Sequence, residues 1–244
     1  MFGKVLKLSL LVLGLSQVVY GQSKIVGGYP ATISDVPYIV NIRAGGQLIC
    51  GGTLVHRRFV VTAASCIWKY YAPQMIVQGN TANFNEVGLR RKVNRVIYPA
   101  AYNTQTLDFD VAMLRLDSPM NGANTVPIGL YTNGVPVGAT LKVSGWGQIS
   151  ENGNNSNQLQ SVLVTSIAKD RCLASYELTS TMFCARGPGT DACEGDGGGP
   201  AVYNGQLAGI ISWGFGCARP NYPGVYTSIA MVAPFINQAI RNNS

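Results

Sequence analysis

The sequence predicts an all-β protein with one regular helix near the C-terminus. Short apolar or alternating segments recur along the chain with turn residues between them. Twenty-nine glycines and 12 prolines among the 244 residues punctuate these segments, as a β-sandwich or β-barrel requires. Near the end, the hydrophobic spacing changes to three and four residues, which indicates an amphipathic helix.

The strand segments combine β-branched or aromatic residues with flanking turn residues. In chain order we expect strands at residues 38–43, 53–55, 59–63, 75–78, 92–97, 111–116, 140–144, 159–167, 207–212 and 224–228. The expected terminal helix has Val232, Phe235, Ile236, Ala239 and Ile240 on one face. The polar run at 151–157 predicts an exposed loop, because a core would not accept it.

Residues 1–21 have the pattern of a secretory signal peptide. Lys4 and Lys7 give a basic start, an apolar run follows at residues 8–15, and Gly21 offers a small residue for cleavage. The apolar run is shorter than the ~20 residues that span a bilayer. We therefore expect a secreted, extracellular protein without a membrane span.

The charge of the mature chain gives no reason to expect nucleic-acid binding. Loss of residues 1–24 removes three lysines and leaves 15 basic and 11 acidic residues, so the net charge falls from +7 to +4. A nucleic-acid-binding face would need more concentrated basic charge. One cluster, Arg90, Arg91, Lys92 and Arg95, fits a solvated strand edge better than a polyanion site, although both interpretations remain open.

The cysteine and histidine contents restrict the remaining chemistry. Six cysteines in a secreted chain predict three disulfides, with 15 pairings open from the sequence alone. There is no Cys-x-x-Cys spacing and His56 is the only histidine, so we expect no metal site and no cofactor. Asn154 and Asn242 begin glycosylation sequons.

Eight motifs, in order, resemble those of the trypsin-like serine proteases, the chymotrypsin-fold family. They cover nearly all of residues 25–240 and stand at residues 25–28, 50–52, 62–66, 110–114, 145–147, 191–200, 212–214 and 223–227. The resemblance implies two packed six-stranded antiparallel β-barrels, in halves of about 25–135 and 136–244, a C-terminal helix and a cleft between the barrels. It also implies the disulfides Cys50–Cys66, Cys172–Cys184 and Cys193–Cys217.

Two of these motifs depart from the family where catalysis occurs. The motif at 62–66 has Ser65 where the family has its general-base histidine, and the motif at 195–200 has Gly197 where the family has its nucleophilic serine. Asp110 matches the aspartate that orients the histidine. The resemblance therefore implies an inactive homologue, because the mechanism needs both the hydroxyl and the imidazole. His56 lies nine residues before Ser65, and we expect it at the surface.

The binding residues of the family are better preserved. Asp191 matches the residue at the base of the primary specificity pocket, where a carboxylate selects Lys or Arg by charge-assisted pairing. The remaining positions match pocket walls, peptide-pairing backbone and oxyanion-hole amides: Gly214 and Gly224, Ser212 and Trp213, and Gly195 and Gly197. The resemblance thus implies a cleft that holds a basic peptide without cutting it.

The resemblance also implies an activation site. Residues 22–24 match a short propeptide ahead of a domain at 25–244, and Lys24-Ile25 matches the cleaved bond. In the family, the freed α-amino group of the residue matching Ile25 pairs with the acid matching Asp196. Here the pair is either inherited structural support or a conformational switch that outlived catalysis.

Three functions are consistent with these observations. The first is a monomeric, non-catalytic binder of basic peptides, protease inhibitors or cascade partners. The second is an active endopeptidase that cuts after Lys or Arg, which Gly197 and Ser65 oppose. The third is a surface protein that recognises glycans through Arg90–Arg95.

Overall fold

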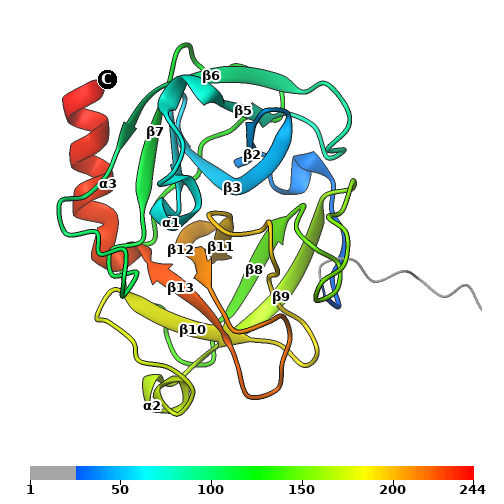
Figure 1. The fold of residues 1–244 in the computed structure, drawn as a ribbon, viewed down its shortest axis with the longest axis vertical. Coiled ribbons are helices and arrows are strands. Elements are labelled where there is room, and N and C mark those ends of the chain that lie inside the picture. The colour runs from blue at the N-terminus through cyan, green and yellow to red at the C-terminus, as the bar shows by residue number, and fades with distance from the viewer. Residues whose placement is uncertain (1–25) are drawn as a thin grey trace, which may run out of the picture.

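The computed structural model describes residues 26–244, which form two β-barrels packed on one another (Figure 1). The first barrel is closed in the order β2-β3-β4-β7-β6-β5. Its strands are β2 (Ile39–Ala44), β3 (Gln47–His56), β4 (Phe59–Thr62), β5 (Met75–Gly79), β6 (Leu89–Ile97) and β7 (Ala112–Leu116). All of its strand pairs are antiparallel.

The second barrel runs in the order β9-β10-β13-β12-β11-β8 and is closed by pairing of β8 with β9. Its strands are β8 (Thr140–Gly145), β9 (Gln160–Ile167), β10 (Met182–Arg186), β11 (Pro200–Tyr203), β12 (Gln206–Trp213) and β13 (Gly224–Ser228). A two-residue strand, β1 (Tyr29–Pro30), adds to the outside of β9. The predicted all-β fold with two six-stranded barrels is therefore confirmed.

The short helices lie between strands. They are α1 (Ala64–Ile67), α2 (Lys169–Leu173) and two 3₁₀ turns at Ile33–Asp35 and Ala72–Gln74. The predicted terminal helix is α3 (Ile229–Asn243), which contacts β12 and β13 of the second barrel and β7 of the first (Figure 1). Its side chains Val232, Ile236 and Ala239 are buried, while Phe235 and Ile240 pack at the margin of the same core.

The expected strands were incomplete at three places. Strands β10 and β11 were not predicted, and β3 is ten residues long where the sequence suggested residues 53–55. Gly51 and Gly52 lie inside β3. A Cβ at Gly51 would stand 2.9 Å from the Gly199 Cα, so this glycine permits close approach of the second barrel.

The structure contains three disulfides, Cys50–Cys66, Cys172–Cys184 and Cys193–Cys217. These are the pairs that the family resemblance implies. The sequon residues Asn154 and Asn242 are both exposed, one in a loop and one at the end of α3. Within residues 26–244, none of the helices has the length and hydropathy needed to cross a bilayer. The expected signal peptide and cleavage site lie outside the described residues.

Candidate functional site

The structure brings Ser65, Asp110 and Ser212 together between the barrels. Ser65 lies in α1, directly after β4, Asp110 precedes β7, and Ser212 comes from β12 of the second barrel. The Ser65 hydroxyl donates to Asp110 Oδ2 at 2.8 Å, and the Ser65 N–H donates to Oδ1 at 2.7 Å. The Ser212 hydroxyl donates to Oδ2 at 2.5 Å. Ser212 therefore lines the cleft but directs its hydroxyl at Asp110.

The Asp110 carboxylate is fully buried. Burial raises its pKa above the ordinary value, while the hydrogen bonds from Ser212 and Ser65 act in the opposite direction. Hydrogen bonds of this kind offset the cost of burying a charged carboxylate in the folded protein. Ser65 thus supplies a donor to Asp110 but carries no group that can accept and return a proton near neutral pH.

His56 does not join this cluster. It ends β3, its Nδ1 accepts from the Arg58 N–H at 3.2 Å, and its ring packs against Phe59 at 5.5 Å. Ser65 instead follows the opposite end of β4, so the strand separates the two residues. The histidine is half-buried rather than fully exposed, and its place in the hairpin keeps it away from Asp110.

The loop at Gly197 retains its backbone bonds without a side chain. The Gly197 carbonyl accepts from the Gly51 N–H at 2.8 Å, which ties this loop to β3 of the first barrel. A Cβ at Gly197 would meet only the Cys66 Sγ within 4 Å, at 3.1 Å. Among residues 26–244, the N–H groups of Gly195 and Gly197 donate to no acceptor.

Beside this loop is a cavity of about 480 Å³. Its lining includes the predicted pocket residues Asp191, Ser212, Trp213, Gly214 and Gly224, together with Gly195 and Gly197. A Cβ at Gly214 would have no contact closer than 3.8 Å, so this wall is open. A Cβ at Gly224 would lie 2.9 Å from Asp191 Oδ1, so the absence of a side chain there leaves the space beside this oxygen free.

Asp191, which lines the cavity, has an unused acceptor. Its Oδ2 accepts from the Ala218 N–H at 3.2 Å, but its Oδ1 has no partner within the described part of the chain. Burial raises the pKa of Asp191 to about 7. The buried Tyr226 hydroxyl lines the same cavity and also lacks a partner among these residues. A buried atom of this kind is costly unless a ligand satisfies it.

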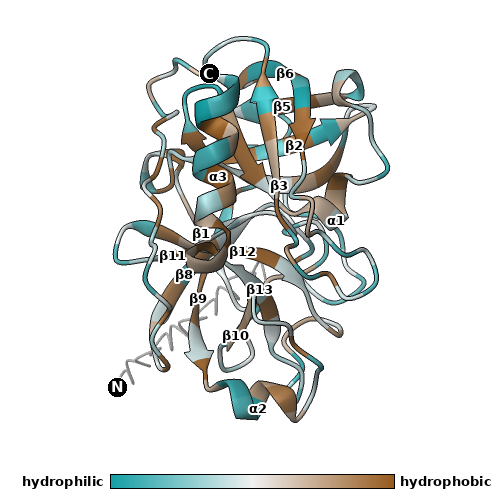
Figure 2. Ribbon diagram, turned by 90° about the vertical axis from the view of Figure 1, so that its left-hand side faces the viewer, coloured by the Kyte–Doolittle hydropathy of each residue, from teal (hydrophilic) through white to brown (hydrophobic). Residues whose placement is uncertain are grey.

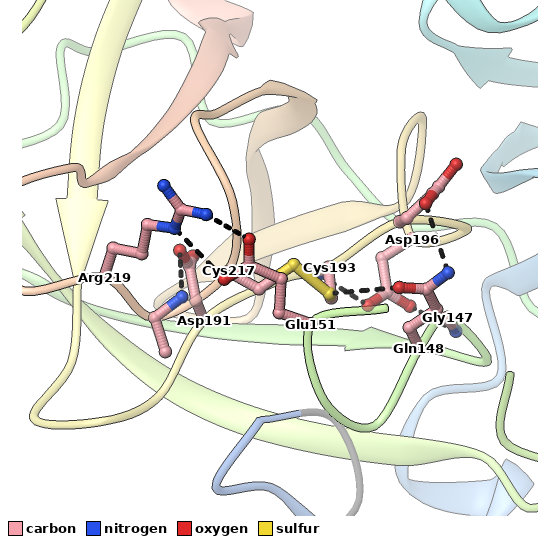
Figure 3. The surroundings of a disulfide bond; sticks show 10 residues. Gly147, Gln148, Glu151, Asp191, Cys193, Asp196, Cys217 and Arg219 are labelled. Carbon is pink, nitrogen blue, oxygen red and sulfur yellow. Dashed lines mark hydrogen bonds and ion pairs between the residues drawn. A yellow bond between two sulfur atoms is a disulfide. The ribbon is translucent and has the colours of Figure 1, made fainter. Parts of the chain in front are cut away.

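An ion pair at the mouth of the pocket was not anticipated from the sequence. Glu151, which lines the cavity, pairs with Arg219 at 2.5 Å, and both lie beside the Cys193–Cys217 disulfide (Figure 3). The Arg219 guanidinium also stands 4.9 Å from the centre of the Phe215 ring. Sequence reasoning placed Glu151 only in an exposed polar loop, because its partner stands 68 residues away.

Asp196, the predicted acid of the activation pair, is completely buried. Its carboxylate accepts from the Gly147 N–H at 2.7 Å and from the Cys193 N–H at 3.1 Å (Figure 3). Burial raises its pKa to about 6, and no cation pairs with it within residues 26–244. Lys24 and Ile25 lie outside the described residues, so the pairing of Ile25 with Asp196 stays a prediction.

Comparison with known proteins agrees with this architecture. The Trypsin family model matches residues 25–236. Trypsin delta of Drosophila erecta is 38% identical over 82% of this chain and 81% of its own. Seminase of Drosophila melanogaster is 39% identical, covering 84% and 77%. The vitellin-degrading protease of Bombyx mori is 37% identical, covering 86% and 83%.

The solved structure of neuropsin, a serine protease expressed in the limbic system of mouse brain, has the same fold. It superimposes with a TM-score of 0.82 at 31% identity, covering 87% of this chain and 98% of neuropsin. The solved neighbour shares the two-barrel fold, and the family model and the relatives match most of the chain. The chain therefore belongs to the trypsin family of serine proteases.

Proposed function

We propose that this protein is a secreted, non-catalytic member of the trypsin family that binds basic segments of peptides, protease inhibitors or cascade partners. The observation that carries the proposal is the contrast between two neighbouring regions of one cleft. The catalytic positions hold Gly197 and Ser65, whereas the pocket retains a buried carboxylate with an unpartnered oxygen.

The catalytic half of the cleft lacks the atoms that acyl transfer needs. Gly197 has no nucleophile, and Ser65 hydrogen-bonds Asp110 where an imidazole would act as base. Loss of the nucleophile or the base alone costs on the order of 10⁶ in turnover in a protease with this mechanism. The Ser65 hydroxyl is a poor substitute nucleophile, because a carboxylate is a weak activator of an alcohol. We therefore assign no peptidase activity to this chain.

The binding half of the cleft has the features of a site for a basic side chain. Asp191 Oδ1 and the Tyr226 hydroxyl are both buried and unpartnered within the described residues, and both border the same cavity. A Lys or Arg side chain would satisfy these acceptors and offset the cost of burying the carboxylate. The backbone of Ser212, Trp213 and Gly214, which line the cavity, is the candidate edge for an extended ligand.

The proposed secretion rests on the signal-like N-terminal pattern and the three disulfides. Disulfides of this number are typical of proteins that fold in an oxidising compartment. In the secreted form we place the N-terminus at Ile25, and we propose that its α-amino group pairs with Asp196. The buried carboxylate would then gain the cation that it lacks within residues 26–244.

Calorimetric titration of the chain beginning at Ile25 with an Arg-presenting protein inhibitor tests the proposal. We expect saturable one-to-one binding that Asp191→Asn weakens at least ~100-fold, because a buried charged hydrogen bond is lost. Asp117→Asn, at an exposed aspartate, is the matched control and should bind as the parent does. Unchanged affinity of Asp191→Asn would refute the pocket assignment, and hydrolysis of an Arg-amide by the parent would refute the non-catalytic assignment.

A second candidate function, recognition of anionic glycans, rests on the basic residues of β6. Arg90 and Arg95 donate to the neutral acceptors Gln78 and Asn243, and Arg91 donates to the Pro119 carbonyl. Within residues 26–244 no carboxylate neutralises any of them. Retention on heparin at physiological salt would support this function, since weak surface electrostatics are screened there, and elution below that salt concentration would refute it.

A further inference from the structure

We propose that the preferred ligand is a polypeptide that ends in Lys or Arg, with its terminal carboxylate bound by the N–H groups of Gly195 and Gly197. This inference rests on the proposed function and adds to it, because it assigns the end of the ligand as well as its basic side chain. It makes the cleft a receptor for chain ends rather than for the interior of a chain.

The first observation is the space at residue 197. Cys66 Sγ is the only atom that a Cβ at this position would meet within 4 Å, and Gly197 itself lines the cavity. The volume that a side chain of residue 197 would occupy is therefore part of the open cavity. A carboxylate has two oxygen atoms, and in the proposed complex the second of them occupies this volume.

The second observation is that two backbone N–H groups beside the cavity are available to donate hydrogen bonds to a ligand carboxylate. The N–H groups of Gly195 and Gly197 lie on either side of the buried Asp196, and within residues 26–244 neither has an acceptor. Both glycines border the cavity that contains Asp191. Hydrogen bonds from backbone N–H groups to a carboxylate are about twice as strong as those to a neutral carbonyl, and backbone donors capture C-terminal carboxylates in other recognition sites.

The third observation is the balance of charge. Asp110 is occupied by donors from Ser65 and Ser212, so it does not compete for the basic group of the ligand. Asp191 Oδ1 is free to pair with that group. The basic side chain of the terminal Lys or Arg then pairs with Asp191, and its terminal carboxylate accepts from the N–H groups of Gly195 and Gly197. Both charges of the ligand are therefore matched.

Peptides of this kind are the products of one class of reaction. Hydrolysis of a peptide bond after Lys or Arg leaves a new chain end with the basic side chain and the carboxylate on one residue. The ligand therefore originates in proteolysis by a catalytically competent enzyme, and this protein would bind the product rather than the intact substrate.

The test compares three peptides by calorimetry with the chain that begins at Ile25. They are acetyl-Ala-Pro-Arg with a free carboxylate, the same peptide as its C-terminal amide, and acetyl-Ala-Pro-Leu with a free carboxylate. We expect the Arg acid to bind with a Kd below ~1 mM and roughly tenfold more tightly than the Arg amide, with no measurable binding of the Leu acid.

Gly197→Ala supplies a second readout. The backbone at residue 197 does not have a positive φ, so alanine adopts it without strain, and its methyl group would stand 3.1 Å from the Cys66 Sγ, a contact that a small shift relieves. We expect the variant to lose most of its preference for the acid over the amide. An unchanged thermal midpoint checks that it folds.

The outcomes separate this inference from the proposed function. Equal or tighter binding of the Arg amide by the parent overturns the assignment of the carboxylate site but leaves a pocket for basic residues. Retention of the full acid preference by a folded Gly197→Ala variant overturns the role of the vacant space. Failure of both Arg peptides to bind overturns this inference, and failure of the Arg-presenting inhibitor as well overturns the proposed function.

Discussion

At the scale of single residues, the main finding is how Ser65 supplies hydrogen bonds to a buried carboxylate. Its hydroxyl and its N–H both donate to Asp110. Asp110 is consequently hydrogen-bonded although it is fully buried. A hydroxyl at residue 65 therefore favours folding more than an apolar side chain would.

Replacement of Ser65 by alanine tests this account. We expect Ser65→Ala to lower the free energy of unfolding by about 1–2 kcal/mol, because Asp110 loses one charge-assisted hydrogen bond. Ser118→Ala is a matched control, since Ser118 donates to the exposed Asp117 at 3.1 Å. Urea denaturation measures both variants. Equal losses would show that burial of Asp110 gives the Ser65 bond no additional value.

Introduction of a serine at residue 197 and a histidine at residue 65 tests whether the rest of the cleft can support catalysis. The double variant Gly197→Ser and Ser65→His should hydrolyse an Arg-p-nitroanilide at least ~10³-fold faster than either single variant, because nucleophile and base act as a unit. The backbone supports it, since residue 197 lacks a positive φ and residue 65 already bonds Asp110.

Asp110→Asn added to the double variant is the control, and it should lose most of the restored rate. A folded double variant that is as inactive as the parent would contradict the idea that the remainder of the cleft is competent. Burst kinetics with an ester substrate would then show whether acylation or binding is missing.

At the scale of elements, β6 and β7 place two cations directly opposite each other. Arg95 and Arg115 are cross-strand partners, and both donate to Asn243 at the end of α3. Figure 2 shows hydrophilic segments on β6 and at the C-terminal end of α3. Like charges in this arrangement destabilise a sheet, although cations beside a helix C-terminus are favourable.

Reversal of one charge should stabilise this pair of strands. We expect Arg95→Glu to raise the free energy of unfolding by ~0.2–1 kcal/mol through pairing with Arg115. Lys92→Glu on the same strand is the control, because Lys92 lies opposite Ile76 and gains no cross-strand cation. Thermal denaturation at low salt compares the two. A larger gain from Lys92→Glu would indicate that overall charge, rather than the pair, controls stability.

At the scale of the whole molecule, the structure buries three aspartates, Asp110, Asp191 and Asp196. Burial raises the pKa of Asp110, and it raises those of Asp191 and Asp196 to about 7 and about 6. The unfolded chain titrates these groups near ~3.9, so the folded state binds more protons between the two values. Their contribution to stability is fully present below pH ~4 and is lost as the pH rises through about 6 and 7.

The thermal midpoint of the full chain should therefore fall by several degrees between pH 5 and pH 8. Asp191→Asn should reduce this fall, because the variant buries no charge at the higher pH. Differential scanning fluorimetry over this range measures both proteins. A parent midpoint that rises to pH 8, or an equal fall in the variant, would contradict this contribution of the buried carboxylates.

Much of the fold could be predicted from local patterns in the sequence. The alternating segments and the terminal helix were recognisable because burial on one face leaves a periodic signal. Strands β10 and β11 were not, since Met182–Arg186 is a short run without apolar–polar alternation and Pro200–Tyr203 begins at a proline after three glycines. Both strands depend on pairing with distant neighbours.

The sequence by itself determined which atoms the cleft contains. It excluded a side-chain nucleophile at residue 197 and an imidazole at residue 65, because no folding event can supply a missing group. It also placed an acid at residue 191, but left open whether that acid would be paired. Covalent composition is a local property, so the sequence is sufficient to specify it.

Only the tertiary structure decided how those atoms are used. The hydroxyls of Ser65 and Ser212 converge on Asp110, Glu151 pairs with Arg219, and one oxygen of Asp191 stays without a partner in the described chain. These residues come from segments far apart in sequence and from both barrels. Their chemistry depends on the packing of one barrel against the other, because hydrogen bonding and desolvation act over a few ångströms of space regardless of separation along the chain.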